Sequence, residues 1–128
     1  MRTFVALLSS AVLLGLTGLA QAEKLVSPPF PTQLFTSGAC YVRNTGTTPV
    51  SVQVSLFSNN GLIVSTDTCN DNPLAAGETC VILVNDLPDD SFAACSLTAG
   101  TVAKLRGTFE IRENIGGVLR VIAAEDLR

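Results

Sequence analysis

The stretch "VSVQVSLF", Val50–Phe57, alternates apolar and polar side chains from Val50 to Leu56. Successive side chains of a β-strand point to opposite faces of a sheet, so the alternation predicts a strand with one buried face and one face in water. A second stretch, "AKLRGTFEIR" at Ala103–Arg112, repeats this pattern and predicts an inward row that includes Phe109 and Ile111. The two stretches together predict sheets that cover a hydrophobic core.

Short segments rich in Val, Ile, Thr and Phe follow one another, separated by turn residues at intervals of roughly ten residues. Beyond the N-terminal segment, no apolar repeat is long enough for a helix. The spacing predicts an all-β fold, a sandwich or barrel of seven to eight antiparallel strands, with a terminal hairpin closed by "NIGG" at Asn114–Gly117. The expected strands are Gln33–Thr36, Ala39–Asn44, Val50–Phe57, Leu62–Thr68, Thr79–Val84, Phe92–Thr98, Ala103–Arg112 and Val118–Ala124.

The N-terminal segment "MRTFVALLSSAVLLGLTGLAQA" has the parts of a secretory signal peptide. Arg2 supplies a positive charge, an uncharged apolar run follows, and Ala20-Gln21-Ala22 provides the small residues after which signal peptidase cleaves. We expect residues 1–22 to be removed, leaving a mature protein that begins at Glu23 and has no membrane contact. A retained anchor is the alternative, because the apolar run approaches the roughly 20 residues that span a bilayer.

Residues 23–31, "EKLVSPPFP", are rich in proline. Proline lacks the backbone N–H that a sheet interior needs, and it favours an extended polyproline conformation. We therefore expect residues 23–31 to form an extended N-terminal arm outside the sheets. Residues 32–128 have the length of one domain with one core.

All four cysteines lie in the predicted mature protein, and an even number in an exported chain predicts two disulfides. Zinc is disfavoured because the chain has no His and its cysteines lack tight paired spacings. The alternation of side chains along the predicted strands places Cys40 and Cys95 on core-facing sides. This position favours a disulfide between two strands that are distant in the sequence. Cys69 and Cys80 then form a local bridge, although two other pairings remain open.

The charge and the residue inventory exclude several functions. Loss of Arg2 leaves seven basic and eleven acidic residues, a net charge of −4, which argues against nucleic acid as a partner. The absence of His removes the usual general base, and no glycine loop that could hold a phosphate occurs. We expect a non-enzymatic protein without a cofactor.

Three groups of residues are candidate sites. A basic interaction face is expected from Lys104, Arg106, Arg112 and Arg120, with a solvated strand face as the alternative. The loop "CNDNPLAAGETC", Cys69–Cys80, reads as a disulfide-closed connection, whose residues 70–78 an inhibitor or effector would use. The oxygen-rich residues Asp67, Asn70 and Asp71 would supply a calcium site, as in calcium-dependent adhesins, against the alternative of turn-forming residues that bond their own backbone.

The motifs "CYVRNTGTTPVSVQVSLFSNNG", "LAAGETCVI", "FAACSLT" and "KLRGTFEIR", spread over Ala39–Arg112, carry a family resemblance. They resemble small uncharacterised exported bacterial proteins that consist of one immunoglobulin-like β-sandwich. "RNTGTTPVSVQV" and "LAAGE" also look like pieces of bacterial cell-adhesion-related modules. The resemblance implies an immunoglobulin-like sandwich with two disulfides and carries no catalytic residue over.

We therefore expect a secreted or periplasmic binding or structural module that acts through contacts with an unknown protein partner. A small secreted inhibitor or effector is the second hypothesis, and a calcium-dependent adhesin is the third.

Overall fold

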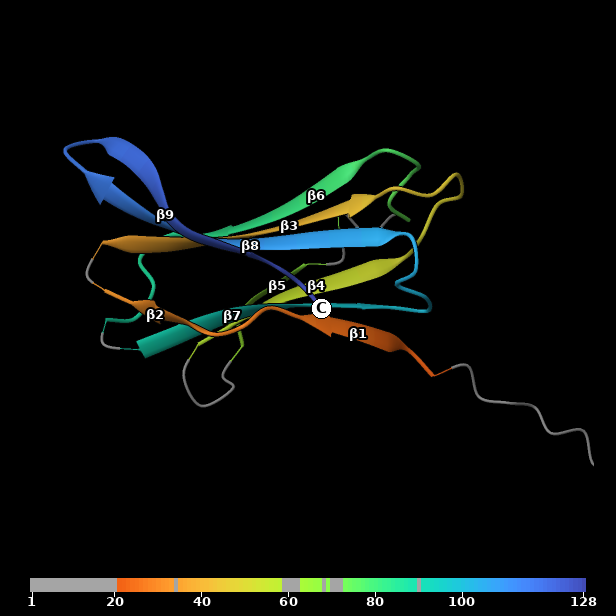
Figure 1. Cartoon of the computed structure of the whole chain (residues 1–128), viewed down its shortest axis with the longest axis horizontal. Helices are drawn as coiled ribbons and strands as arrows, with labels where there is room; N and C mark the ends of the chain where they lie inside the picture. The colour runs from red at the N-terminus through yellow and green to blue at the C-terminus, as the bar shows by residue number, and fades with distance from the viewer. Residues whose placement is uncertain (1–20, 34, 59–62, 68, 70–72, 90) are drawn as a thin grey trace, which may run out of the picture.

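A computed structural model describes residues 21–128 apart from residues 34, 59–62, 68, 70–72 and 90. The described part is all-β and holds nine strands joined by turns and irregular segments (Figure 1). The strands are β1 (Glu23–Val26), β2 (Phe30–Thr32), β3 (Thr36–Asn44), β4 (Val52–Phe57), β5 (Ile63–Asp67), β6 (Thr79–Val84), β7 (Ser91–Ala99), β8 (Leu105–Ile115) and β9 (Val118–Asp126).

The strands form two stacked antiparallel sheets (Figure 1). The first sheet has the order β1-β7-β4-β5, and β2 pairs with β7 as well. The second sheet has the order β6-β3-β8-β9. The predicted all-β, two-layer architecture is confirmed, with nine described strands in place of the seven to eight expected.

The core lies between the sheets and follows the predicted alternation. Val52, Val54 and Leu56 of β4 are at most 4% exposed, and Phe109 and Ile111 of β8 are at most 1% exposed. The polar face of β4 departs from the prediction at one residue. Ser55 is buried between its cross-strand partners Thr66 of β5 and Ser96 of β7, and its hydroxyl lies 2.9 Å from the hydroxyl of Thr66.

The expectation of an N-terminal arm outside the sheets is wrong. β1 pairs antiparallel with one part of β7, and β2 pairs with another part. The apolar residues of the segment supply the driving force, since Leu25 and Phe30 pack against the core and the Phe30 ring lies 5.9 Å from that of Phe109. Pro28 and Pro29 lie between the two strands, and Pro31 occupies an edge strand, where a missing N–H is tolerated.

The strand expected at Gln33–Thr36 is also wrong, because Phe35 lies in a turn and, of the described residues in this range, only Thr36 belongs to a strand. Thr36 N–H donates to the Gln33 carbonyl over 3.2 Å, and the Thr36 hydroxyl donates to the same oxygen over 2.7 Å. Thr36 is the first residue of β3, and β3 includes the whole strand expected at Ala39–Asn44. Within the turn, Phe35 has a φ of 62°.

Two disulfides join the cysteines in the predicted pairs. Cys40 of β3 and Cys95 of β7 link the two sheets through the centre of the core, and both residues are 0% exposed. Cys69 is bonded to Cys80 at the start of β6, with their Cα atoms 5.5 Å apart. Two disulfides are consistent with an oxidising compartment.

Candidate functional site

The β8–β9 hairpin reaches beyond the strand beside it. β3 begins at Thr36, which pairs with Glu113, so the end of β8 and the start of β9 continue past β3. The turn is Gly116-Gly117, with φ values of 60° and 85° that glycine adopts without steric penalty. Asn114 Oδ1 accepts a 3.0 Å hydrogen bond from Gly117 N–H. Figure 1 shows the hairpin as a projection from one end of the sandwich.

Aliphatic side chains cover both faces of this projection. Ile115, Val118 and Leu119 lie past β3 and are between 52% and 61% exposed. Val121 and Ile122, at 54% and 51% exposed, continue the apolar row along β9 where β3 still pairs with β8. Paired residues of antiparallel strands share a face, so Ile115 and Val118 lie on one face, whereas Leu119 lies on the other. A surface strand ordinarily keeps its solvent face polar, and a cluster of exposed apolar side chains marks a contact surface.

Phe35 lies next to the base of the hairpin. The Phe35 carbonyl accepts a 3.3 Å hydrogen bond from Asn114 N–H. Its ring is exposed, with 71% of the residue surface open to solvent, and its backbone is in the left-handed region that a bulky side chain rarely adopts. Phe35 therefore combines an exposed aromatic ring with an unfavourable backbone conformation, and strained residues of this kind cluster at functional sites. We call Phe35 and the five exposed aliphatic residues of the hairpin the apolar tip.

The four basic residues of the expected interaction face lie in two places. Lys104 is exposed in the turn before β8, and Arg106 and Arg112 lie on the outward face of that strand. Arg120 pairs with Glu113, whose side chain points to the opposite side of the sheet from that of Arg112. Arg120 therefore belongs to the hairpin and not to the face of the other three.

Arg112 is held on the sheet surface by two neighbours. Its Nη2 lies 2.9 Å from Glu110 Oε2, and its guanidinium lies 5.5 Å from the centroid of the Tyr41 ring. Both carboxylate and guanidinium are partly buried at 22% side-chain exposure. The observed contacts of Arg112 are therefore within the sheet, where they cover the buried Ala39.

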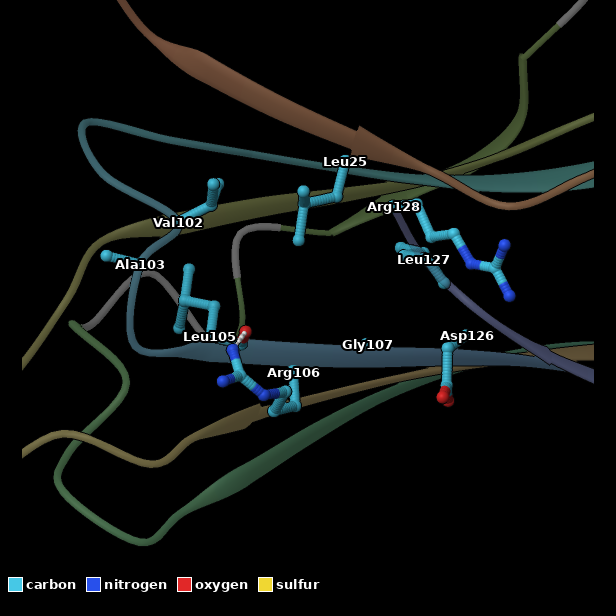
Figure 2. A pocket seen from close by; sticks show the side chains of 9 residues that line it. All are labelled: Leu25, Val102, Ala103, Leu105, Arg106, Gly107, Asp126, Leu127 and Arg128. Carbon is cyan, nitrogen blue, oxygen red and sulfur yellow. Dashed lines mark hydrogen bonds between the residues drawn. The ribbon is translucent and has the colours of Figure 1, made fainter.

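An open groove lies at the other end of β8, between the start of that strand and the C-terminal residues (Figure 2). Its volume is about 410 Å³. The side chains of Leu25, Val102, Leu105 and Leu127 form its apolar floor. Arg106, Asp126 and Arg128 stand at its rim. In Figure 2 the Asp126 and Arg128 side chains point away from that floor, whereas Arg106 Nη1 donates a 2.8 Å hydrogen bond to the Leu105 carbonyl.

The described half of the Cys69–Cys80 loop is fastened to Asn44. The Asn44 side-chain amide donates to the carbonyls of Leu74 and Thr48 over 2.9 Å and 2.8 Å, and the Asn44 carbonyl accepts from Gly77 N–H. Leu74 also pairs with Val50 and is 5% exposed. Residues 73–78 are therefore an exposed connection anchored to the sheets through Leu74 and Gly77.

The proposed calcium ligands Asn70 and Asp71 lie outside the described residues, and Asp67 ends β5. Among the residues that the structure describes, no group of three or more His, Cys, Asp or Glu is placed to hold a metal ion. The same residues include no helix with the length and apolar character of a membrane span. Residues 1–20 of the expected signal peptide lie outside the described part.

Comparison of the chain with models of protein families, with curated proteins and with solved structures gives no match. The site must therefore be interpreted from its own geometry.

The sequence analysis did not predict the apolar tip, although the sequence contains a pattern that indicates the β9 part of it. "VLRVI", Val118–Ile122, holds two adjacent apolar pairs, and neighbouring residues of a strand point to opposite faces. Such pairs predict an apolar side chain on each face of the hairpin. Phe35 carries no comparable signal, because its exposure depends on a turn that only the folded chain shows.

Proposed function

We propose that this protein is an exported, non-enzymatic binding module that acts through protein contacts at the apolar tip. The observation that carries the proposal is the projecting end of the molecule, where exposed aliphatic side chains cover both faces of a hairpin and a strained Phe35 stands beside it. Clusters of exposed apolar side chains on a folded protein mark interaction surfaces, and the apolar tip is such a cluster.

Export is the second part of the proposal. The signal peptide expected at residues 1–22 and the two disulfides both support a secreted or periplasmic location. The first strand starts at Glu23, the residue expected to begin the mature protein, so cleavage would leave every described strand intact.

We also infer an immunoglobulin-like arrangement for the four central strands. β3 and β6 pair in one sheet and β4 and β7 in the other, as strands B and E and strands C and F do in that fold. The Cys40–Cys95 bridge joins β3 to β7, which corresponds to the B–F disulfide. The terminal strands differ, because β1 flanks β7 and β8 flanks β3, and the hallmark Trp is absent from the chain.

The test is a capture experiment with matched variants. The oxidised protein, a Leu119→Asp variant, a Phe35→Gly variant and a Phe92→Ser control are immobilised and exposed to envelope and culture-medium extracts of the host. Phe92 is 51% exposed on β7, in the other sheet from the hairpin, so its loss controls for a general decrease in exposed apolar surface. We expect one protein to be retained by the wild type and the control but not by the two tip variants. Equal retention by all four would refute the apolar tip as the contact surface.

A further inference from the structure

Strand β6 is the least protected sheet edge in the described part of the chain. It ends the order β6-β3-β8-β9, so among the described residues no strand lies on its other side (Figure 1). Its six residues, "TCVILV", contain no charge and no proline, and its pairing with β3 is regular. A regular, apolar and uncharged edge of this kind pairs readily with another extended chain.

Each of the other edges has a feature that opposes strand pairing. β1 is covered at its end, because Val26 N–H donates to the Arg128 carbonyl over 3.0 Å and Arg128 N–H donates back over 3.2 Å. β2 contains Pro31, β5 ends in Asp67, and β9 carries Arg120 and an irregularity in its pairing with β8. Prolines, charges and irregularities are features by which proteins protect sheet edges. β6 has none of them.

The hydrogen bonds of β3 show which backbone groups of β6 point away from the sheet. Asn44 N–H donates to the Glu78 carbonyl over 3.0 Å, whereas Thr45 N–H donates to the Lys104 carbonyl over 2.8 Å. The two sides alternate along a strand, so even-numbered residues of β3 bond toward β6 and odd-numbered residues bond toward β8. Even-numbered residues of β3 pair with even-numbered residues of β6. The backbone N–H and C=O groups that point away from β3 therefore belong to the odd-numbered residues of β6: Thr79, Val81 and Leu83.

These odd-numbered residues also turn their side chains outward. Val81 and Leu83 are 47% and 50% exposed, whereas the intervening Ile82 is 4% exposed in the core. Val81 lies opposite Tyr41 of β3, and Leu83 lies opposite Ala39. The edge therefore presents a donor and an acceptor at every second residue, beside a row of apolar side chains. The backbone of an extended chain supplies partners at this spacing, so the occupant is an extended segment with apolar side chains next to Val81 and Leu83.

Two acidic residues in line with β6 indicate which chain fits the edge. Glu78 directly precedes the strand and Asp86 follows it; both are exposed, and neither forms a salt bridge within the described part of the chain. An antiparallel second copy would bring Glu78 toward Asp86 of its partner, and a parallel copy would bring each acid beside its own counterpart. Like charges in opposite positions destabilise strand pairing. Arg43 lies one strand further in, opposite Thr79, and so outside the row that an added strand would occupy.

We propose that β6 is a second contact site and that it binds an extended segment of another protein as an added strand. The segment has apolar side chains that contact Val81 and Leu83, and it carries Lys or Arg near each end, beside Glu78 and Asp86. Backbone hydrogen bonds supply affinity in such a contact, and the alternate side chains supply specificity. The site is distinct from the apolar tip, because β3 and β8 lie between β6 and β9 in the sheet.

The test uses the exported, oxidised protein and a synthetic peptide in which three valines alternate with two threonines between terminal lysines. Hydrogen exchange followed by NMR should show that the Val81 and Leu83 amides exchange faster than the Ile82 amide in the free protein, and that the peptide slows their exchange. Methylation of the three valine nitrogens of the peptide should abolish binding, because these nitrogens face β6. Methylation of the threonine nitrogens is the matched control and should leave binding in place.

Two variants separate backbone pairing from loss of apolar surface. Val81→Pro removes an N–H that takes no part in the β3 ladder, and proline is tolerated on an edge strand where its nitrogen faces solvent. It should weaken peptide binding by about tenfold or more, because a backbone acceptor of the peptide loses its donor. Val81→Thr keeps the N–H and the branched shape and should weaken binding less. Leu119→Asp, on the apolar tip, should bind the peptide as the wild type does.

Absence of peptide binding would overturn the inference, and so would unchanged exchange of the Val81 and Leu83 amides. Equal binding of the valine-methylated peptide would overturn it as well, and this result does not depend on whether Val81→Pro folds. A peptide with terminal glutamates that binds as tightly would refute the assigned charges. Loss of binding in Leu119→Asp would place the peptide on the apolar tip and refute a second site.

Discussion

Replacement of both Cys40 and Cys95 by alanine should destabilise the protein more than replacement of Cys69 and Cys80. The first bridge spans a sequence separation of 55, and the chain-entropy model gives it about 4 kcal/mol. The second spans 11 residues and is worth about 3 kcal/mol in the same model. Both sulfurs of the first bridge are also fully buried, so their removal leaves a cavity that adds roughly 1–2 kcal/mol.

The double variant at Cys40 and Cys95 should therefore lose about 5–6 kcal/mol, a large part of the roughly 5–15 kcal/mol that holds a domain folded. Urea unfolding followed by far-UV circular dichroism measures the difference, and emission from Tyr41, the single Tyr in a chain without Trp, gives a second probe. The variant at Cys69 and Cys80 is the matched control. An equal or larger loss in that control, or a loss below ~2 kcal/mol at Cys40 and Cys95, would refute the reasoning.

Four further results are expected. Gly38→Ala should cost ~1–3 kcal/mol, because its Cβ would lie 2.8 Å from Leu56 Cδ1, whereas Gly100→Ala, with open space around it, should cost less than ~1 kcal/mol by the same urea assay. Asn44→Ala should cost about 3 kcal/mol, because this buried side chain donates to Thr48 and Leu74 and accepts from Gly46; a loss under ~1 kcal/mol would contradict that role. Phe35→Gly should change the free energy of unfolding by less than ~1 kcal/mol, since relief of backbone strain offsets the lost packing and the added chain entropy; a large loss in thermal unfolding would assign Phe35 a structural role. Millimolar calcium should leave the melting temperature unchanged, and a clear rise would instead support the alternative of an adhesin that binds calcium through Asp67, Asn70 and Asp71.

Local patterns explain why much of the fold could be predicted. The alternation of side chains along a strand depends only on residues two positions apart. It therefore correctly predicted that Val52, Val54 and Leu56 of β4 lie in the core, and it favoured the observed pair of Cys40 and Cys95. The Gly116-Gly117 turn was predictable for the same reason, because its positive φ values are a property of glycine itself.

The N-terminal segment shows where local reasoning failed. Its prolines correctly indicated an extended chain, but whether an extended chain joins a sheet depends on a partner strand far away in the sequence. β7 supplies that partner, since Leu25 lies opposite Leu97 and Phe30 lies opposite Ala93. The basic residues illustrate the same limit, because strand pairing separated Arg120 from Arg112.

By itself, the sequence determined the strand periodicity, the inward rows of side chains and the terminal hairpin turn, because each depends on spacing along one or two strands. It favoured the observed cysteine pairs and left two other pairings open. Only the tertiary structure decided that residues 23–32 belong to the first sheet, that β8 and β9 continue past β3, and that Phe35 is displayed beside them. The physical reason is that the burial of a side chain is set by which strands pack around it, and packing joins residues that are distant in the chain.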